Sequence, residues 1–379
     1  MKKDWTIKKL GEVCEIARGG SPRPIKDFIT TDESGVNWIK IGDTDPTGKY
    51  IYQTAEKIKP AGISKSRFVE EGDFLLSNSM SFGRPYILKT NGCIHDGWLV
   101  LKKYEQTLFI DFFYYLLLSP NVQNQFNIEA KGSTVRNLNT DIVSKIKVSI
   151  PPLEEQKRIV AVLDKKFAQI ETLKTAAEKN LQNTKQLFQS ELEKAFSNTS
   201  WVKKRIDSIS ENHDSERVPI TKNVRTAGKY PYYGASGIVD YVNDYIFEGK
   251  YLLVSEDGAN LLARTYPIAF VAEGKFWVNN HAHILKFENE ETMRMVEYYF
   301  MQLDLSDYVT GMAQPKFNQA SLNKLEIPFP PLEEQKRIVA HLDSLSEKVH
   351  QLEEIYTKQF ADCDELKQSL LQKAFEGEL

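Results

Sequence analysis

The sequence predicts an α+β protein built as a tandem repeat. Two globular domains are expected at opposite ends of an antiparallel two-helix coiled coil, related by an approximate two-fold axis. Three observations support this. PPLEEQKRIVAVLD at 151–164 returns as PPLEEQKRIVAHLD at 330–343, with thirteen of fourteen positions matching at an offset of 179 residues. Apolar residues follow a heptad pattern after each copy. Short strand-like runs and an aromatic helical run precede each copy.

The repeat extends beyond the matched block at the same offset. The residues Gly132, Asn139 and Lys145 correspond to Gly311, Asn318 and Lys324, and KAF at 194–196 corresponds to KAF at 373–375. The opening WTIKKLGEV, from Trp5, resembles WVKKRIDSI, from Trp201. The expected segments are a globular domain at 1–150, a helix at 151–199, a second globular domain at 200–329 and a second helix at 330–379.

Strand-like runs in the second domain include YLLVSE at 251–256 and AFVAE at 269–273. The aromatic helical runs are FIDFFYYLLLSPNVQNQF at 109–126 and TMRMVEYYFMQLDLSDYV at 292–309. These two runs stand at corresponding places in the repeat, which indicates a shared fold beneath diverged sequences.

Each long helix has start signals. Paired prolines fit the first turn, where a backbone N–H would lack a helical partner. The glutamates that follow them suit the positive end of the helix dipole. The expected seam is Leu163, Ile170, Leu173, Ala177 and Leu187 in the first helix, and Leu342, Leu345, Val349, Leu352, Tyr356, Cys363, Leu366 and Leu370 in the second. Each helix should contain roughly 45 residues and extend about 65 Å.

Connectivity favours an intramolecular antiparallel pair, although a coiled-coil dimerisation stalk is the alternative. A fold does not require identical polar residues on two helices, so a duplicated partner would explain them; recent duplication is the other explanation. The candidate partner-binding residues are Glu154, Glu155, Gln156, Lys157 and Arg158, with Glu333, Glu334, Gln335, Lys336 and Arg337.

The composition is that of a globular protein, with 41% hydrophobic and 27% charged residues. The start of the chain has no apolar signal core, and no run approaches the roughly 20 residues of a membrane span. Three cysteines without ligand spacing indicate a reducing, cytoplasmic compartment. Residues 1–150 carry a net charge of +4 and residues 200–329 carry −3, so composition alone does not predict a nucleic-acid partner.

These repeats resemble the specificity subunit of type I restriction–modification enzymes over the whole chain. The resemblance rests on the two PPLEEQKRIVA segments, the long helices ending in KAF, and the stretches EEGDFLLSNSMSFGRPYI and YPYYGASGIVDYVNDYIFEGKYLLVSEDGANL. It implies a non-catalytic DNA reader with two target-recognition domains. Each domain would read one half of a bipartite asymmetric site. The helices would set the spacing and dock two methyltransferase subunits, which motor-nuclease subunits would join.

The family's chemistry is adenine methylation by the partner, so S-adenosylmethionine, ATP and magnesium would bind to partner subunits and this chain would need no cofactor. The sequence agrees, because it contains no G-x-G fingerprint and no phosphate-binding P-loop. Two E-x-K triplets, at 248–250 and 273–275, are common by chance. A coiled-coil adaptor without DNA, or a self-contained methyltransferase or nuclease, remain the alternative functions.

Polar residues on Gly-rich or Pro-rich loops are the candidate DNA contacts, because Arg pairs with guanine and Asn with adenine. In the first domain they are Arg18, Arg23, Ser77, Asn78, Ser79, Ser81, Arg84 and Arg136. In the second they are Tyr232, Tyr233, Ser236, Asp257, Asn260, Arg264, Asn279, Asn280, His281, His283, Gln314 and Lys316. Ordinary turns and packing are the alternative for each residue. His281 and His283 share a face, but no third ligand is evident, so no metal site is expected.

Overall fold

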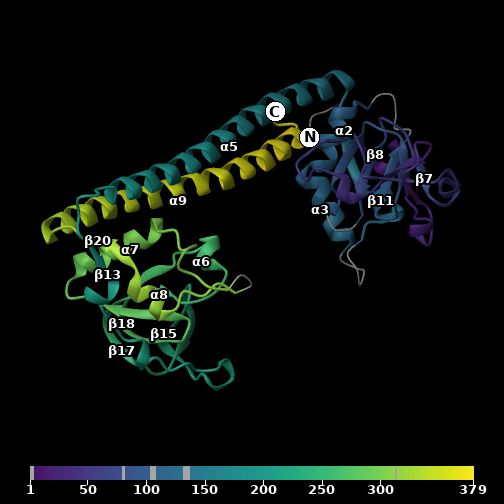
Figure 1. Cartoon of the computed structure of the whole chain (residues 1–379). Helices are drawn as coiled ribbons and strands as arrows, with labels where there is room; N and C mark the ends of the chain where they lie inside the picture. Colours follow the sequence, from purple (N-terminus) through teal and green to yellow (C-terminus); the bar gives the residue numbers. More distant parts are fainter. Residues whose placement is uncertain (1–3, 79–81, 103–107, 131–136, 312–313) are drawn as a thin grey trace. The chain divides into compact units, whose positions relative to one another are not determined.

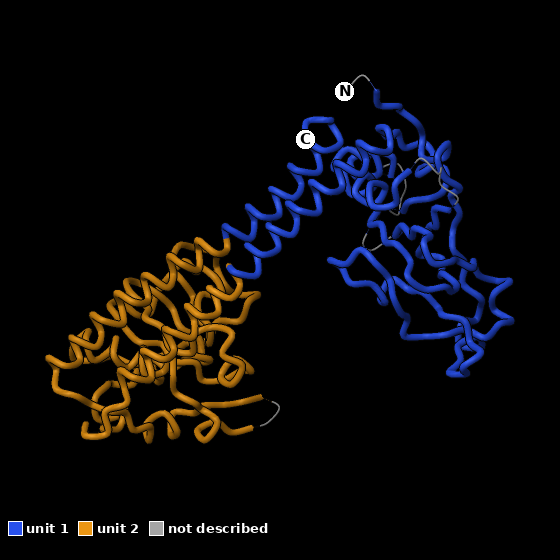
Figure 2. The backbone as a smooth tube through the Cα atoms, turned by 90° about the horizontal axis from the view of Figure 1, so that it is seen from above, with its two compact units in different colours: residues 1–176, 358–379 blue, residues 177–357 orange. Residues whose placement is uncertain are grey.

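A computed structural model describes residues 4–78, 82–102, 108–130, 137–311 and 314–379. Contacts divide the chain into two units (Figure 2). Unit 1 contains residues 1–176 and 358–379, and unit 2 contains residues 177–357. Each unit therefore includes a globular part together with portions of both long helices. This division differs from the four expected segments because the helices pack against the globular parts.

The globular part of unit 1 contains, in its described residues, two five-stranded sheets and a two-stranded ribbon. The first sheet has the order β2 (Glu15–Arg18), β11 (Trp98–Lys102), β8 (Phe74–Ser77), β9 (Pro85–Leu88), β5 (Tyr50–Ile51). The second has the order β3 (Ile29–Thr30), β6 (Glu56–Ile58), β4 (Val36–Ile39), β10 (Gly92–Ile94), β7 (Arg67–Val69). The ribbon pairs β1 (Thr6–Lys9) with β12 (Lys147–Ile150). It therefore joins the start of the chain to the segment before the first long helix.

Helices cover the core of unit 1: α1 (Leu10–Val13), α2 (Ile110–Leu118), α3 (Pro120–Glu129) and α4 (Thr140–Lys145). The expected aromatic helical run is split between α2 and α3 at Ser119, which caps α3 and precedes Pro120. Asn139 caps α4 by accepting the Ile142 N–H at 2.8 Å.

Unit 2 contains a six-stranded sheet among its described residues. The order is β14 (Glu211–Asn212), β19 (Ala282–Lys286), β17 (Phe247–Ser255), β18 (Ala269–Val278), β15 (Ala227–Gly234), β16 (Gly237–Val242). Both expected strands are confirmed in β17 and β18. A second ribbon pairs β13 (Lys203–Arg205) with β20 (Glu326–Pro328). The helices are α6 (Asn260–Ala263), α7 (Glu290–Gln302) and α8 (Gln319–Lys324), and Asn318 caps α8 as Asn139 caps α4.

The two long helices are α5 (Leu153–Ala195) and α9 (Leu332–Glu376), which run side by side (Figure 1). In unit 1 the start of α5 packs with the end of α9, where Leu163 and Leu371 share one core. In unit 2 the end of α5 packs with the start of α9, where Leu192 and Leu342 share another. The helices are therefore antiparallel, as the connectivity predicts.

The expected seam in α5 is wrong at two of its five positions. Leu163, Ile170 and Ala177 are buried, but Leu173 and Leu187 are exposed. In a pair of helices each helix covers only one side of the other, so the remaining apolar positions face outward.

No helix in the described part of the chain combines the length and apolar character needed to cross a membrane.

Candidate functional site

The candidate loops of unit 2 converge where β17 ends and the neighbouring β19 begins. The Ser255 hydroxyl donates to the Ala235 carbonyl, which fixes the β15–β16 turn against β17. The Glu256 N–H donates to the His281 carbonyl at 2.9 Å, and the Gly258 N–H donates to the Pro315 carbonyl at 3.0 Å. Four loops that are far apart in the sequence therefore form one face of the unit.

Several candidate side chains lie on the exposed part of this face. His281 is exposed, and its Nδ1 lies 2.9 Å from both carboxylate oxygens of Asp257. Lys316 forms a β-bridge with Asp257, and its Nζ lies 3.2 Å from Glu256 Oε1. The other exposed candidates are Ser236, Asn280 and Gln314. This set presents donors and acceptors of the kinds that read base edges.

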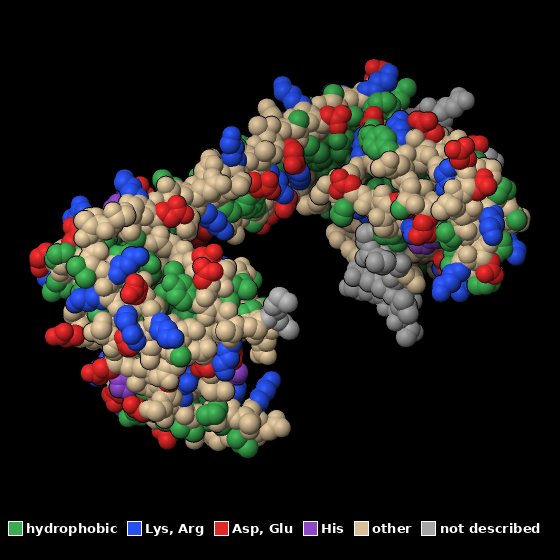
Figure 3. All heavy atoms as spheres, viewed as in Figure 1, with side chains coloured by type: hydrophobic (Ala, Val, Ile, Leu, Met, Phe, Trp, Pro, Cys, Tyr) green, Lys and Arg blue, Asp and Glu red, His purple; other side chains and the backbone are tan. Residues whose placement is uncertain are grey.

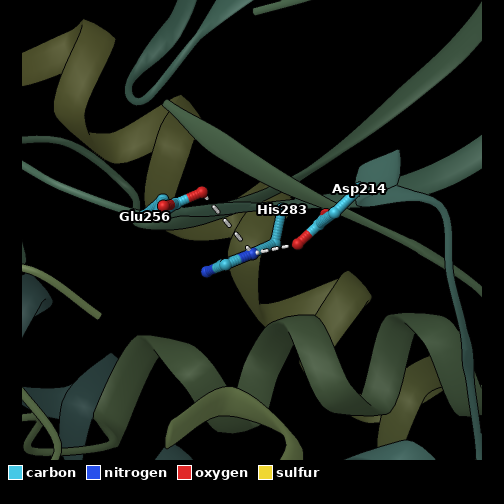
Figure 4. Close-up of side chains that lie close together, drawn as sticks. All are labelled: Asp214, Glu256 and His283. Atoms are coloured by element: carbon cyan, nitrogen blue, oxygen red, sulfur yellow. Dashed lines mark hydrogen bonds and ion pairs between the residues drawn. The ribbon is translucent and has the colours of Figure 1, made fainter. Parts of the chain in front are cut away.

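A buried ionic cluster lies directly beneath this face (Figure 4). His283 is fully buried, and its Nδ1 lies 2.6 Å from Asp214 Oδ2 and 3.9 Å from Glu256 Oε2. Burial acts to raise the pKa of Asp214, but hydrogen bonds from His283 and the Ile284 N–H and nearby positive charge lower it overall. Burial also acts to raise the pKa of Glu256, but Arg217, His283 and Lys316 lower that pKa overall. Both carboxylates are therefore held ionised.

The ligand atoms of Asp214, Glu256 and His283 lie within 4.8 Å of one another, a spacing that a metal ion could bridge. The groups already have other partners, however. Arg217 Nη1 lies 2.7 Å from Glu256, and His283 Nε2 lies 2.7 Å from the Phe317 carbonyl. Sequence reasoning missed Asp214 and Glu256 because neither lies near His283 in the chain. The arrangement fits an ion-pair cluster better than a metal centre.

Three candidates in unit 2 have buried side chains with structural partners, and their contact with DNA stays a prediction. Tyr232, Asn279 and His283 are buried. The Tyr232 hydroxyl accepts the Ile220 N–H at 2.9 Å, and Asn279 Oδ1 accepts the His281 N–H at 2.8 Å.

Three other candidates in unit 2 are held by local packing and hydrogen bonds. The Arg264 guanidinium donates to the Phe300 and Leu303 carbonyls at the end of α7. The Asn260 side-chain amide donates to the Tyr266 carbonyl and accepts the Tyr266 N–H. Tyr233 packs its ring against Phe270 and Phe276. These contacts make loop support the main role of the three side chains.

In unit 1 the candidates gather around Asp96, which the sequence did not single out. Arg18 Nε donates to the Asp96 carbonyl at 3.2 Å, and Asn78 Nδ2 donates to it at 2.8 Å. Arg23 is 81% exposed and its Nη2 lies 3.4 Å from the Asp96 carboxylate. The Ser21 hydroxyl, which donates to that carboxylate at 2.8 Å, is the main group lowering the pKa of Asp96.

Ser77 and Asn78 are buried with internal partners, and the prediction that they read bases stays untested. The Ser77 hydroxyl accepts the Arg84 N–H at 3.0 Å, while Arg84 Nη2 donates to the Gly48 carbonyl at 3.2 Å. This places Arg84 in the β8–β9 turn as a structural residue. Ser79, Ser81 and Arg136 lie outside the described residues.

The repeated helix starts attach each long helix to its own globular part. Gln156 and Gln335 were expected to face outward, but each is only 1% exposed. Gln156 Oε1 accepts the Phe109 N–H at 2.8 Å, and its Nε2 donates to the Pro151 carbonyl at 2.9 Å. Gln335 similarly bonds the Thr292 hydroxyl and the Pro330 carbonyl. The expectation of exposure fails because these amides satisfy buried polar groups at the junction.

A second matched link lies three turns along each helix. The Tyr115 hydroxyl of α2 donates to Asp164 at 2.5 Å, and the Tyr298 hydroxyl of α7 donates to Asp343 at 2.5 Å. Asp343 also binds Arg294 at 2.6 Å. Much of the repeated segment therefore recurs because it meets the same intramolecular neighbours twice.

The remaining repeated polar residues form matched surface ion pairs. Glu154 pairs with Lys157 at 2.8 Å and Glu155 with Arg158 at 2.6 Å. The same pairs recur as Glu333 with Lys336 at 2.9 Å and Glu334 with Arg337 at 2.6 Å. Matched leucines are also exposed on the long helices: Leu173 and Leu366 in unit 1, Leu352 and Leu187 in unit 2. Each unit thus presents matched ion pairs and exposed leucines on its long helices, and these residues are called its helical surface.

Charge is mixed over the faces seen in Figure 3, where Lys and Arg side chains are interspersed with Asp and Glu.

The Methylase_S family model, the type I restriction modification DNA specificity domain, matches residues 2–182 and again residues 198–358. The chain belongs to this family. The resemblance drawn from the repeats is therefore confirmed, and so is the tandem arrangement.

Curated relatives agree with the family assignment. The chain is 35% identical over 155 residues to a putative type I restriction enzyme specificity subunit of Haemophilus influenzae, a match that covers 41% of this chain and 40% of that relative. It is 23% identical to the putative MjaX specificity subunit of Methanocaldococcus jannaschii, across 99% of this chain and 94% of that one.

Solved structures share the fold. The HsdS subunit from Thermoanaerobacter tengcongensis has a TM-score of 0.63 at 21% identity, covering 100% of this chain and 98% of that one. A chain from a study of complex assembly in the type I restriction–modification system has a TM-score of 0.81 at 20% identity, covering 100% and 99%. The α+β prediction with long helices is confirmed.

Proposed function

We propose that this chain is the non-catalytic DNA-recognition subunit of a type I restriction–modification complex in the cytoplasm. Unit 1 reads one half of a bipartite asymmetric site through the loops around Asp96. Unit 2 reads the other half through the face that carries Asp257, His281 and Lys316. The long helices set the spacing between the two half-sites.

One observation carries this proposal: the two units have equivalent helical surfaces but unlike loop faces. The Glu155–Arg158 pair of unit 1 recurs as Glu334–Arg337 in unit 2. The loop faces instead centre on Asp96 in unit 1 and on Glu256 and His283 in unit 2. Equal surfaces suit two copies of one partner, whereas unlike faces suit an asymmetric DNA site.

The partner proposed for the helical surfaces is the methyltransferase subunit, in two copies, with motor-nuclease subunits joining the assembly. Those subunits bind S-adenosylmethionine, ATP and magnesium, so this chain acts through recognition. The exposed leucines lie next to the ion pairs Lys174–Asp364, Lys367–Glu171 and Lys185–Glu353. This mixture of apolar and charged groups is typical of a protein interface, in which apolar groups form the centre and polar groups the rim.

Co-expression with the methyltransferase subunit tests the DNA-reading role. Single-molecule sequencing should find methylated adenines in one bipartite asymmetric motif. Replacing the unit 2 face by Asp257→Ala with Lys316→Ala should alter only one half of that motif. The purified chain with S-adenosylmethionine and duplex DNA should transfer no methyl groups. Methyl transfer by the chain alone would support the self-contained enzyme, and a complex without sequence preference would support the adaptor.

Stoichiometry tests the docking surfaces. Leu173→Glu with Leu366→Glu should remove one methyltransferase copy, and Leu187→Glu with Leu352→Glu should remove one copy as well. Light scattering of the purified complex measures the loss. Ile128→Glu on α3 is the matched control, because this exposed apolar residue lies off the long helices. Retention of both copies in both double variants would exclude these leucines from the interface.

A further inference from the structure

The charge state of the buried His283 follows from its two hydrogen bonds. Its Nδ1 lies 2.6 Å from an Asp214 carboxylate oxygen and its Nε2 lies 2.7 Å from the Phe317 carbonyl oxygen. Both oxygens only accept hydrogen bonds once Asp214 is ionised. Both ring nitrogens must therefore donate, so His283 is an imidazolium cation inside the unit.

The groups around His283 are two cations and two carboxylates, whose charges cancel one another. Arg217 lies 3.6 Å from Asp214 and 2.7 Å from Glu256, and Lys316 lies 3.2 Å from Glu256. Three cations thus face two carboxylates, which leaves a net charge of +1. A divalent metal ion would add further positive charge to this buried site, whereas the excess charge suits a surface that receives DNA phosphates.

The cluster also fixes the main chain of the recognition loops. The Phe317 carbonyl accepts from His283, and the Phe317 N–H donates to the Glu256 carbonyl at 2.7 Å. The Glu256 N–H in turn donates to the His281 carbonyl at 2.9 Å. The three tethered segments carry the exposed side chains of His281 and Lys316 and the partly exposed side chain of Asp257.

We infer that the cluster of His283, Asp214, Glu256 and Arg217 is a positioning element that sets the sequence preference of unit 2. The inference rests on the proposed function of that face. A binding constellation needs its groups held within about 0.5 Å of their productive geometry, and buried neighbours with locked rotamers provide that precision. Removing one buried partner leaves the others unpaired, so the loop ends must move to satisfy them.

The test is selection of binding sites from a randomised bipartite library, using the full chain in complex with the methyltransferase subunit. The variant is His283→Gln, which removes the buried positive charge. We expect discrimination at the unit 2 half-site to fall about tenfold, the scale of a base-reading contact. The unit 1 half-site serves as an internal control and should keep its preference.

Two further variants keep the test decisive. Glu256→Gln retains an oxygen that faces Arg217, so it should fold if His283→Gln does not, and it should relax the same half-site by a smaller factor. His350→Gln is the matched control, because His350 is 74% exposed on α9, and it should change neither half-site. Folding of each variant is checked by circular dichroism.

The possible outcomes separate this inference from the proposed function. A wild-type complex that selects no sequence would refute the proposed function itself. A wild-type complex that selects a bipartite site, together with folded variants that select the same site, would overturn the inference alone. Equal relaxation of both half-sites would also overturn it, because general destabilisation would then explain the effect.

Discussion

Unit 1 and unit 2 resemble each other where the globular part meets the long helix and differ where the loops gather. At the junction, Gln156 and Gln335 bond proline carbonyls, and Asp164 and Asp343 bond tyrosines. The sheets differ, since unit 1 has two five-stranded sheets and unit 2 has one of six strands, among described residues. The repeated residues are thus largely those that must satisfy the same buried groups twice.

The loop faces show the opposite relationship. In unit 1 a partly exposed Asp96 gathers Arg18, Arg23 and Asn78. In unit 2 the buried His283 lies 2.6 Å from Asp214 and 3.9 Å from Glu256, under the surface. The two faces therefore use different electrostatic arrangements, which allows each to change without altering the junctions.

The largest expected effect is at the buried glutamines. Gln156→Leu and Gln335→Leu should each lower the free energy of unfolding by about 2–4 kcal/mol, because two buried polar groups lose a partner. The loss should be greater for Gln156, since the Phe109 N–H cannot turn away whereas the Thr292 hydroxyl can rotate. Denaturant unfolding measures the change, and hydrogen exchange assigns it to a unit. Gln189→Leu, at an exposed position of α5, is the control; equal stability of control and Gln156→Leu would contradict the prediction.

Removing the tyrosine hydroxyls at the two junctions should destabilise the two units to different extents. Tyr115→Phe should cost about 1–2 kcal/mol, because the Asp164 carboxylate loses a charge-assisted bond. Tyr298→Phe should cost about half as much, since Arg294 still binds Asp343 at 2.6 Å. Thermal unfolding of both variants provides the comparison. Identical losses would show that Arg294 does not support Asp343.

Acid should weaken unit 2 through Asp214. The pKa of this buried carboxyl is lowered in the folded protein, so the unfolded chain binds the proton more readily. The stabilisation from Asp214 is therefore present above the unfolded pKa of about 4 and is lost as the pH falls below it. Asp214→Asn should reduce stability at neutral pH and flatten its decline between about pH 5 and pH 3. Hydrogen exchange in unit 2 measures both; an unchanged decline would assign the acid sensitivity to other groups.

The smallest effect on folding is expected at the surface ion pairs. Exchanging Glu155 and Arg158, as Glu155→Arg with Arg158→Glu, should change the unfolding free energy by less than about 1 kcal/mol, because the pair is exposed. The equivalent exchange at Glu334 and Arg337 should behave alike. Each should nevertheless weaken binding of one methyltransferase copy, measured by light scattering. Unchanged stoichiometry when all four residues are exchanged would remove these pairs from the docking surface.

The repeat, the long antiparallel helices and the family can all be predicted from the order of the amino acids. Those features are local or periodic: paired prolines and glutamates begin a helix, and apolar spacing marks its buried side. Asn139 and Asn318 occupy equivalent positions in the repeat, and each caps a helix. The sequence also identified the loops that carry His281 and Lys316, because polar residues next to glycine or proline indicate turns.

Which of those side chains face outward depends instead on long-range packing. Alternation along a strand puts His281 and His283 on one face, yet β19 carries His283 into the interior while His281 lies beyond the buried strands. Asp214 and Asp96 gained their roles from neighbours about 70 to 80 residues away in the chain. The sequence predicts Gln156 on the surface because amides are usually solvated. In the structure it is buried because its amide satisfies a buried N–H and a proline carbonyl. Burial and hydrogen-bond partners depend on long-range contacts, which local sequence patterns do not specify.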